Sequence, residues 1–258
     1  RVTGKIESFA PHAKIIHIDI DPTSISKNVN VDLPIVGDCK NVLSKILSLV
    51  GEEDTDSFRL GLGKWYQSID RWKNIHDMNY QQGEIIKPQY VVEKIYELTK
   101  GEVIVTTEVG QNQMWTAQYY HFIKPRTLLT SGGLGTMGYG FPAAMGAQVA
   151  FPDKLVIDIA GDGSFQMNSQ ELATVVQYQL PVKVAILNNG YLGMVRQWQD
   201  LFYGKRYVAT PLSCPDFVKI AEAYGIPGLR VKKRIEVIPA IQKAMAHDGP
   251  FLIDFVVE

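Results

Sequence analysis

The sequence predicts an α/β fold: a doubly wound, mostly parallel sheet with helices on both faces. From about residue 88 onward, short apolar runs typical of strands alternate with segments whose apolar residues recur every three or four positions. Such alternation is typical of a parallel sheet covered by helices on both faces. A composition of 46% hydrophobic and 21% charged residues is that of an ordinary globular protein.

The elements of this larger part follow from the same periodicities. Pro88 suits the first turn of a helix, because its missing N–H has no partner there. We expect helices at residues 88–100, 111–120, 169–179, 193–202, 215–225 and 235–247, and strands at 102–108, 154–160, 182–189 and 250–258.

The part before residue 88 is organised differently. It predicts strands at 14–20 and 33–38 and a helix at 41–50, which together are too little to bury a core. We therefore expect residues 1–50 to be the tail of a larger central domain, and residues 51–87 a linker containing an amphipathic helix with two tryptophans. Residues 88–258 form the main predicted domain. The chain opens on Arg1 without an initiator Met, so we expect it to be part of a longer protein.

Charge and cysteine usage exclude some functional classes. The formal net charge is −1, and no block of Lys and Arg is present, so nothing favours a nucleic-acid partner. No apolar run approaches the ~18 residues of a membrane span, so no membrane role is expected. Cys39 and Cys214 lie in unrelated contexts. They are expected to be free thiols in a reducing cytoplasm.

One acid and a pair of amides are the candidate metal ligands. Asp162 follows the strand 154–160, and Asn189 ends the strand 182–189. The carboxyl ends of parallel strands meet at one edge of a sheet, where α/β folds bind ligands. Oxygen donors of this kind suit Mg²⁺. From spacing alone a structural turn is an equal alternative, and Asn168 with Glu171 is expected to cap the helix that follows.

Two glycine-containing segments complete the candidate site. The first, "TTEVGQNQMW", follows a strand and begins a helix, so its free N–H groups at Val109, Gly110, Gln111 and Asn112 suit an anion. A plain helix cap by Asn112 is the alternative. The second is "SGGLGTMGYGFPAAMGA". We attribute Gly138, Gly140 and Gly146 to a Gly/Ala helix packed close to the sheet, whereas "GLGTM" leaves backbone groups free for a flat ring.

The combination of GDG with NN about 25 residues later resembles the diphosphate–metal motif of thiamine-diphosphate enzymes. The resemblance implies that Asp162, Asn189 and the carbonyl of Tyr191 hold Mg²⁺ against the cofactor. It also implies that Met137 supports the bent cofactor and that the Gly135 carbonyl accepts a hydrogen bond from its 4′-amino group. The remaining cofactor contacts implied are Gly161, Gly163, Ser164, Leu192, Gly193 and Met194.

Longer motifs resemble the acetolactate synthase family in particular: "TTEVGQNQMW", "SGGLGTMGYGFPAA", "GMVRQWQ" and "GLRVKK". The resemblance implies decarboxylation of pyruvate and addition to a second 2-ketoacid, pyruvate or 2-ketobutyrate, in branched-chain amino-acid biosynthesis. Trp198 is the residue expected to contact the second ketoacid and to discriminate between the two, with a core tryptophan as the alternative. A homodimer or tetramer is implied, with a small regulatory subunit as a further partner.

The same resemblance implies FAD, for which Asp19 and Asp38 are candidate contacts with surface turns as the alternative. The glutamate that contacts the cofactor pyrimidine in this family comes from the amino-terminal domain of a partner subunit. Neither Glu108 nor Glu171 matches its motif, so the chain alone is expected to be inactive. The alternatives are another thiamine-dependent 2-ketoacid decarboxylase or carboligase, and a non-catalytic Mg²⁺–nucleotide module, for which no P-loop is present.

Overall fold

The computed structural model describes residues 4–50, 55–75 and 78–258, and side chains of the second range from residue 61 onward. The chain divides into two compact units, residues 1–77 and 78–258. The expected linker, 51–87, falls on both sides of this division. Its later part is bound into the second unit: Ile86 is fully buried, and its carbonyl accepts a hydrogen bond from the N–H of Glu258 at 3.1 Å.

The first unit contains one small sheet and two helices. Strands β1 (Ile16–Asp19) and β2 (Leu33–Val36) pair in parallel, and the single-turn helices η1 (Ile6–Ser8) and η2 (Pro22–Ser24) lie beside β1 in sequence. Helices α1 (Cys39–Val50) and α2 (Thr55–Ile75) follow. The strands and helices predicted here are confirmed. No side chain described in this unit is buried, in agreement with a segment too small to form a core.

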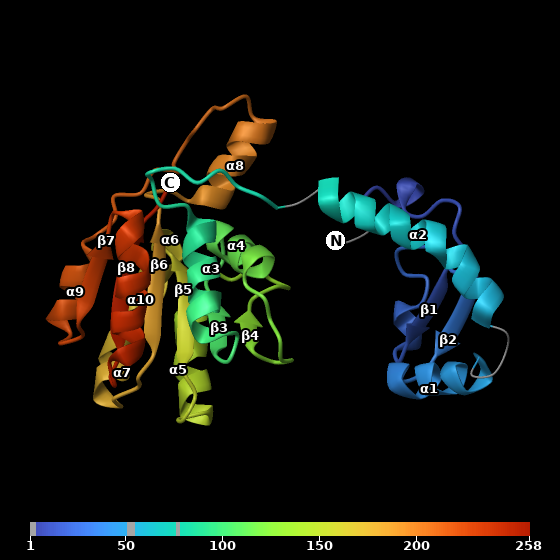
Figure 1. Ribbon diagram of the computed structural model, residues 1–258, viewed down its shortest axis with the longest axis horizontal. Helices are drawn as coiled ribbons and strands as arrows, with labels where there is room; N and C mark the ends of the chain where they lie inside the picture. The colour runs from blue at the N-terminus through green and yellow to red at the C-terminus, as the bar shows by residue number, and fades with distance from the viewer. Residues whose placement is uncertain (1–3, 51–54, 76–77) are drawn as a thin grey trace. The chain divides into compact units, whose positions relative to one another are not determined.

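The second unit is built on a six-stranded sheet in the order β4-β3-β5-β6-β8-β7, in which every pairing among the described residues is parallel (Figure 1). Its strands are β3 (Ile104–Thr107), β4 (Leu128–Thr130), β5 (Val156–Gly161), β6 (Lys183–Asn188), β7 (Gly228–Val231) and β8 (Phe251–Val256). Its helices are α3 (Pro88–Thr99), α4 (Gln111–Tyr119), α5 (Gly140–Ala150), α6 (Asp162–Phe165), α7 (Leu172–Gln177), α8 (Gly193–Phe202), α9 (Phe217–Ala223) and α10 (Val237–Ala246), with 3₁₀ turns η3 (Gln166–Glu171) and η4 (Arg234–Glu236).

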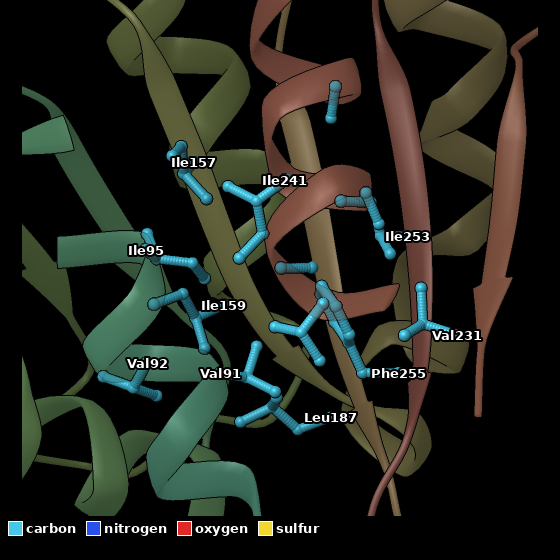
Figure 2. Close-up of a cluster of buried hydrophobic side chains, with 14 of the residues drawn as sticks. Val91, Val92, Ile95, Ile157, Ile159, Leu187, Val231, Ile241, Ile253 and Phe255 are labelled. Atoms are coloured by element: carbon cyan, nitrogen blue, oxygen red, sulfur yellow. The ribbon is translucent and has the colours of Figure 1, made fainter. Parts of the chain in front are cut away.

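Helices cover both faces of this sheet, and each face has its own core. One core joins α3 and α10 to Ile157, Ile159 and Phe255 (Figure 2). The other joins α5, α6, α7 and α9 to Val156 and Ala160. Successive residues of β5 therefore enter opposite cores, as the two-residue period of a strand requires. The predicted doubly wound parallel fold is confirmed.

Two strands and one α-helix of the second unit were missed, and one capping prediction is wrong. The edge strands β4 and β7 have only three and four residues, too short to give a periodic signal. Helix α6 begins at Asp162 directly after β5, where we expected a turn. Asn168 does not cap the next helix. It lies at a non-helical position inside η3, and its side-chain amide donates to the Gly138 carbonyl.

The Gly/Ala helix is confirmed as α5, but its glycines differ. A Cβ on Gly140 would lie 2.5 Å from the Glu108 nitrogen, so the helix contacts the sheet there without room for a side chain. Gly138 precedes the helix at φ +86°. A Cβ on Gly146 would meet nothing within 4 Å, so the prediction of close packing at this glycine is wrong.

None of the described helices combines the length and apolar character needed to cross a membrane. Both cysteines are free thiols, as expected.

Candidate functional site

A cavity of about 440 Å³ opens where the chain leaves β3, β5 and β6 at their carboxyl ends. It lies at the sheet edge at which we predicted a ligand. Its lining contains all the predicted cofactor contacts except Gly135, and three further residues, Trp115, Leu187 and Val195. The full lining is Val109, Gly110, Gln111, Asn112, Trp115, Met137, Gly161, Asp162, Gly163, Ser164, Leu187, Asn189, Tyr191, Leu192, Gly193, Met194 and Val195.

Asp162 connects two of these strand ends. It is 2% exposed and stands in the first turn of α6, at the end of β5. Its Oδ1 accepts the N–H of Gly163 at 2.8 Å, and its Oδ2 accepts the N–H of Gly190, beyond β6, at 2.7 Å. Burial raises the pKa of this carboxyl, and the two N–H donors oppose the rise because they favour the charged form. The expected meeting of the β5 and β6 ends is therefore present.

Asn189 and Tyr191 lie on the loop that Asp162 holds. The Asn189 Oδ1 accepts the Tyr191 N–H at 3.1 Å, and its amide donates to Gln111 at 3.4 Å. Backbone hydrogen bonds from Leu192 to Thr210 and from Leu212 to Gly190 attach the same loop to residues 210–212. The loop carrying two predicted metal ligands is thus bound on both sides. The segment 210–212 was not predicted to take part.

The predicted metal corner, formed by Asp162, Asn189 and Tyr191, has a donor set that suits a hard cation. Among the described residues no group of three or more His, Cys, Asp or Glu side chains is placed to hold a metal. A metal here would rely on one carboxylate, an amide oxygen, a backbone carbonyl and oxygens from the ligand or water. Mg²⁺ is commonly bound in this way, together with substrate phosphates.

The first turn of α4 forms the opposite wall. Gly110 occupies the N-cap position at φ +149°, and no side chain caps this end. Asn112 is not the cap. Its buried amide donates to the carbonyls of Glu108 at 3.1 Å and Ile159 at 2.9 Å, which ties this turn to β5. The uncapped N–H groups therefore remain available to an anion.

Glycines allow the close packing around the cavity. A Cβ on Gly193 would lie 2.1 Å from the Gln111 Oε1. A Cβ on Gly163 would lie 2.9 Å from Leu192 and 3.8 Å from the Met137 Cε, so Met137 lies over the GDG turn. Gly135 is near but outside the lining, at φ +70°, which favours glycine.

Trp198 lies on α8 and is 50% exposed, so the core alternative is wrong for this residue in the described structure. Its role in selecting the second ketoacid stays a prediction.

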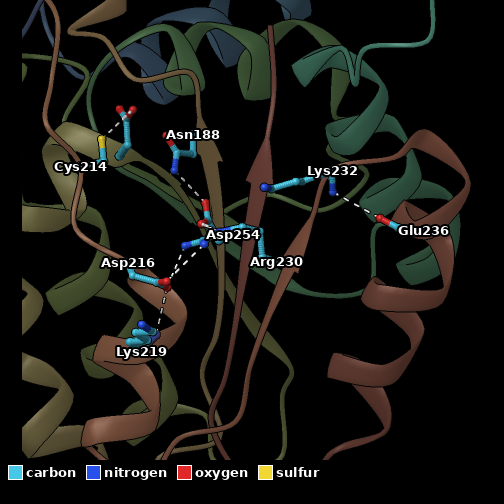
Figure 3. Close-up of polar contacts among 9 residues, drawn as sticks. Asn188, Cys214, Asp216, Lys219, Arg230, Lys232, Glu236 and Asp254 are labelled. Carbon is cyan, nitrogen blue, oxygen red and sulfur yellow. Dashed lines mark hydrogen bonds and ion pairs between the residues drawn. The ribbon is translucent and has the colours of Figure 1, made fainter.

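A second layer of polar contacts lies behind the corner (Figure 3). The fully buried Asp254 of β8 accepts hydrogen bonds from Asn188 at 2.9 Å and from Arg230 of β7 at 2.8 Å. The Cys214 Sγ lies 3.4 Å from the Asp162 Oδ2, and burial together with this carboxylate raises the pKa of the thiol to about 12. These residues were missed. The one available signal was a lone acid inside the apolar run "PFLIDFVVE".

The candidate FAD contacts lie in the first unit and have local partners. The Asp19 Oδ1 accepts the N–H of Asp21 at 2.9 Å, and the Asp38 Oδ1 accepts the N–H of Asn41 at 3.0 Å, at the start of α1. Both contacts are those of surface turns and caps. A flavin contact by either residue stays a prediction.

Comparison with known proteins gives two family matches. Residues 108–255 match the description "Thiamine pyrophosphate enzyme, C-terminal TPP binding domain", and residues 1–46 match "Thiamine pyrophosphate enzyme, central domain". The matched C-terminal region contains every residue of the cavity lining.

Similar curated proteins are acetolactate synthases. The chain is 49% identical to the acetolactate synthase large subunit of Haemophilus influenzae, covering 95% of this chain and 43% of that protein. It is 47% identical to the isozyme 3 large subunit of Escherichia coli, with the same coverage, and 46% identical to a probable large subunit of Methanococcus aeolicus, covering 100% of this chain and 45% of that protein. The chain thus spans less than half the length of these relatives.

Proposed function

Because the chain belongs to the thiamine pyrophosphate enzyme family, we propose that it is the cofactor-binding part of an acetolactate synthase large subunit. The observation that carries the proposal is the contact between Asp162 and Gly190, which joins the GDG turn to the NN loop at the cavity.

The residues present fit the cofactor (thiamine pyrophosphate, or diphosphate) and Mg²⁺. In this proposal Asp162, the Asn189 side chain and the Tyr191 carbonyl bind the cation. The uncapped first turn of α4 binds the diphosphate by its N–H groups, since a helix N-terminus attracts anions. Met137, close to the GDG turn, supports the rings. Trp115 and the buried Leu187 add apolar surface beside them.

When bound, thiamine diphosphate supplies the carbon nucleophile that attacks a 2-ketoacid and accepts the electrons released by decarboxylation. This chain's residues bind and orient the cofactor. The group that would contact the pyrimidine is not among the residues identified here, so we propose that activity requires the amino-terminal domain of a second subunit. The chain alone is proposed to be inactive.

The substrates we propose are pyruvate and a second ketoacid, pyruvate or 2-ketobutyrate, on the pathway to branched-chain amino acids. The half-exposed Trp198, on the helix that continues from Met194, is proposed to contact the second ketoacid. FAD, a homodimeric or tetrameric assembly and a small regulatory subunit are proposed from the similarity to the large subunits above.

The proposal is tested by cofactor binding to the intact subunit. We expect Asp162→Ala to weaken the binding of Mg²⁺ and of thiamine diphosphate together, measured by calorimetry. Asp153→Ala, which removes an exposed acid outside the cavity, is the matched control and should bind both normally. Normal cofactor affinity in Asp162→Ala would show that the metal is held elsewhere.

The same titration, repeated with ATP and NAD, tests the first alternative: binding of either in preference to thiamine diphosphate would favour a nucleotide module instead. An activity assay of the intact subunit with pyruvate tests the second. Formation of a decarboxylated product other than acetolactate would favour a different thiamine-dependent enzyme.

A further inference from the structure

Two acids are buried side by side beneath the first turn of α5, outside the cavity lining. Glu108 follows β3 and Asp158 lies in the middle of the neighbouring strand β5, and both are fully buried. A Cβ on Gly140 would lie 2.5 Å from the Glu108 nitrogen and 2.6 Å from the Asp158 Oδ1, so the helix rests directly on these two residues. Neither acid has a role in the proposed binding of cofactor or metal.

Glu108 accepts two backbone hydrogen bonds from the segment that leads into α5. Its Oε2 accepts the N–H of Gly138 at 2.7 Å, and its Oε1 accepts the N–H of Phe141 at 2.9 Å. The N-cap residue Tyr139 makes no side-chain cap, so Glu108 supplies the acceptor that a cap would normally provide. Burial raises the pKa of Glu108, and the backbone N–H donors oppose this rise because they favour the charged form. The positive end of the helix dipole favours the ionised carboxylate as well.

Asp158 has the opposite environment. Its Oδ1 accepts the Thr106 hydroxyl at 2.8 Å, whereas its buried Oδ2 has no hydrogen-bond partner. Burial, and then the negative charge of Glu108, raise the pKa of Asp158 well above its ordinary value. A second charge here would be buried, unpaired and next to an anion. The neutral acid is therefore the stable form of Asp158 beside an ionised Glu108.

The position of Glu108 connects two walls of the cavity. Its backbone leads directly into the Val109–Asn112 wall, and its carboxylate holds Gly138, the residue after Met137. On the other side of Gly138, the Asn168 amide donates to the Gly138 carbonyl. The two peptide groups on either side of Gly138 are thus each held, one by an acceptor and one by a donor, and Glu108 is the acceptor that belongs to the opposite wall.

We propose that Glu108 is a positioning residue for the cofactor cavity, which as a carboxylate holds the Met137 segment at a fixed place relative to the first turn of α4, while Asp158 serves as its neutral neighbour. The proposal rests on the proposed function for the identity of the ligand. It assigns different protonation states to two acids in one cluster, so substituting each acid by its amide should have different results.

The test compares Glu108→Gln with Asp158→Asn in the intact subunit, with thiamine diphosphate affinity measured by calorimetry at saturating Mg²⁺. An amide at position 108 replaces one acceptor by a donor that faces a backbone N–H, so we expect E108Q to weaken cofactor binding by roughly 10- to 100-fold. We expect D158N to stay within about threefold of the parent, because an amide resembles the neutral acid in shape and leaves no new charge.

Several results would overturn the proposal. One is an unchanged thiamine diphosphate affinity in E108Q, and another is an equal loss of affinity in D158N. If E108Q without cofactor melts at a lower temperature but binds the cofactor normally, Glu108 has only a structural role. If E108Q does not fold, amide hydrogen exchange in the parent decides: the N–H groups of Gly138 and Phe141 should be protected without cofactor, and rapid exchange at both would contradict the proposal. Failure of the parent protein to bind thiamine diphosphate would instead refute the proposed function.

Discussion

Both units of the chain are built from parallel strands and helices, but they bury very different fractions of their side chains. The second unit places both faces of its sheet in contact with helices, and side chains such as Phe141 and Phe255 are fully buried. In the first unit no described side chain is buried, and apolar residues such as Ile16 and Leu47 are 58% and 71% exposed. Parallel strands are normally covered on both faces, and this chain, which spans less than half the length of its relatives, leaves β1 and β2 without that cover.

The comparison teaches where a precise site can be built. The cavity lies at the ends of strands whose residues are held on both faces, so its loops start from fixed points. The predicted flavin contacts start from strands without a core, and the described contacts of their carboxylates are to residues nearby in sequence. Four predictions test or extend this contrast, from the largest expected effect to the smallest.

The largest effect should come from separating the units. Residues 78–258 expressed alone should unfold in one cooperative transition with a free energy within the usual range of about 5–15 kcal/mol. Residues 1–77 alone should show no cooperative transition, because too little apolar surface is buried to offset the conformational entropy. Urea denaturation followed by circular dichroism would check both. A cooperative transition in the shorter piece would break the comparison.

Truncation of apolar side chains should show the same contrast at single residues. Phe255→Ala should lower the free energy of unfolding of the chain by about 3–5 kcal/mol, through lost burial and the cavity it leaves. Leu47→Ala, at an exposed position of α1, is the matched substitution and should change it by less than about 0.5 kcal/mol. Similar losses for the two variants would show that α1 is buried in solution.

The buried acids give the second unit a dependence of stability on pH. The folded-state pKa of Asp158 is raised above its ordinary value of 3.8, so above that pH the unfolded chain releases a proton that the folded chain keeps. Stability is therefore lost as pH rises toward the folded pKa, by up to about 1.4 kcal/mol per pH unit.

Asp158→Asn removes this term. The variant should gain stability relative to the parent as pH increases through this window, when unfolding is measured by urea titration at several pH values. A difference that does not vary with pH would mean that Asp158 is ionised in the folded protein.

Trp198 lies on α8, the helix that carries the cavity residues Met194 and Val195, and we expect its exposure to have a different meaning from exposure in the first unit. Trp198→Leu should leave the free energy of unfolding nearly unchanged, because the indole is half exposed. In the intact subunit it should reduce the preference for 2-ketobutyrate over pyruvate by about tenfold, since one methylene in an apolar pocket contributes about 1–3 kcal/mol. Competition between the two ketoacids, with both products measured, would check this. An unchanged product ratio would remove Trp198 from the specificity site.

Much of the fold and of the cavity could be predicted because the relevant signals are local. The strands β3, β5, β6 and β8 are apolar runs, and parallel topology then brings Asp162 and Asn189 to one edge of the sheet. The edge strands β4 and β7 escaped prediction because their three or four residues carry no period. The cap assigned to Asn168 was wrong because its amide donates to a carbonyl 30 residues earlier, at Gly138, and no local pattern reports such a contact.

By itself, the sequence determined the alternation of elements, the glycines at tight turns and the pairing of a lone acid with two amides beyond a second strand. These are properties of neighbouring residues and of strand direction. Only the tertiary structure decided the uses of Glu108, Asn112, Asp254 and Cys214, since each is set by partners distant in sequence. A buried polar group must find a partner in the folded chain, and which partner it finds depends on packing in three dimensions.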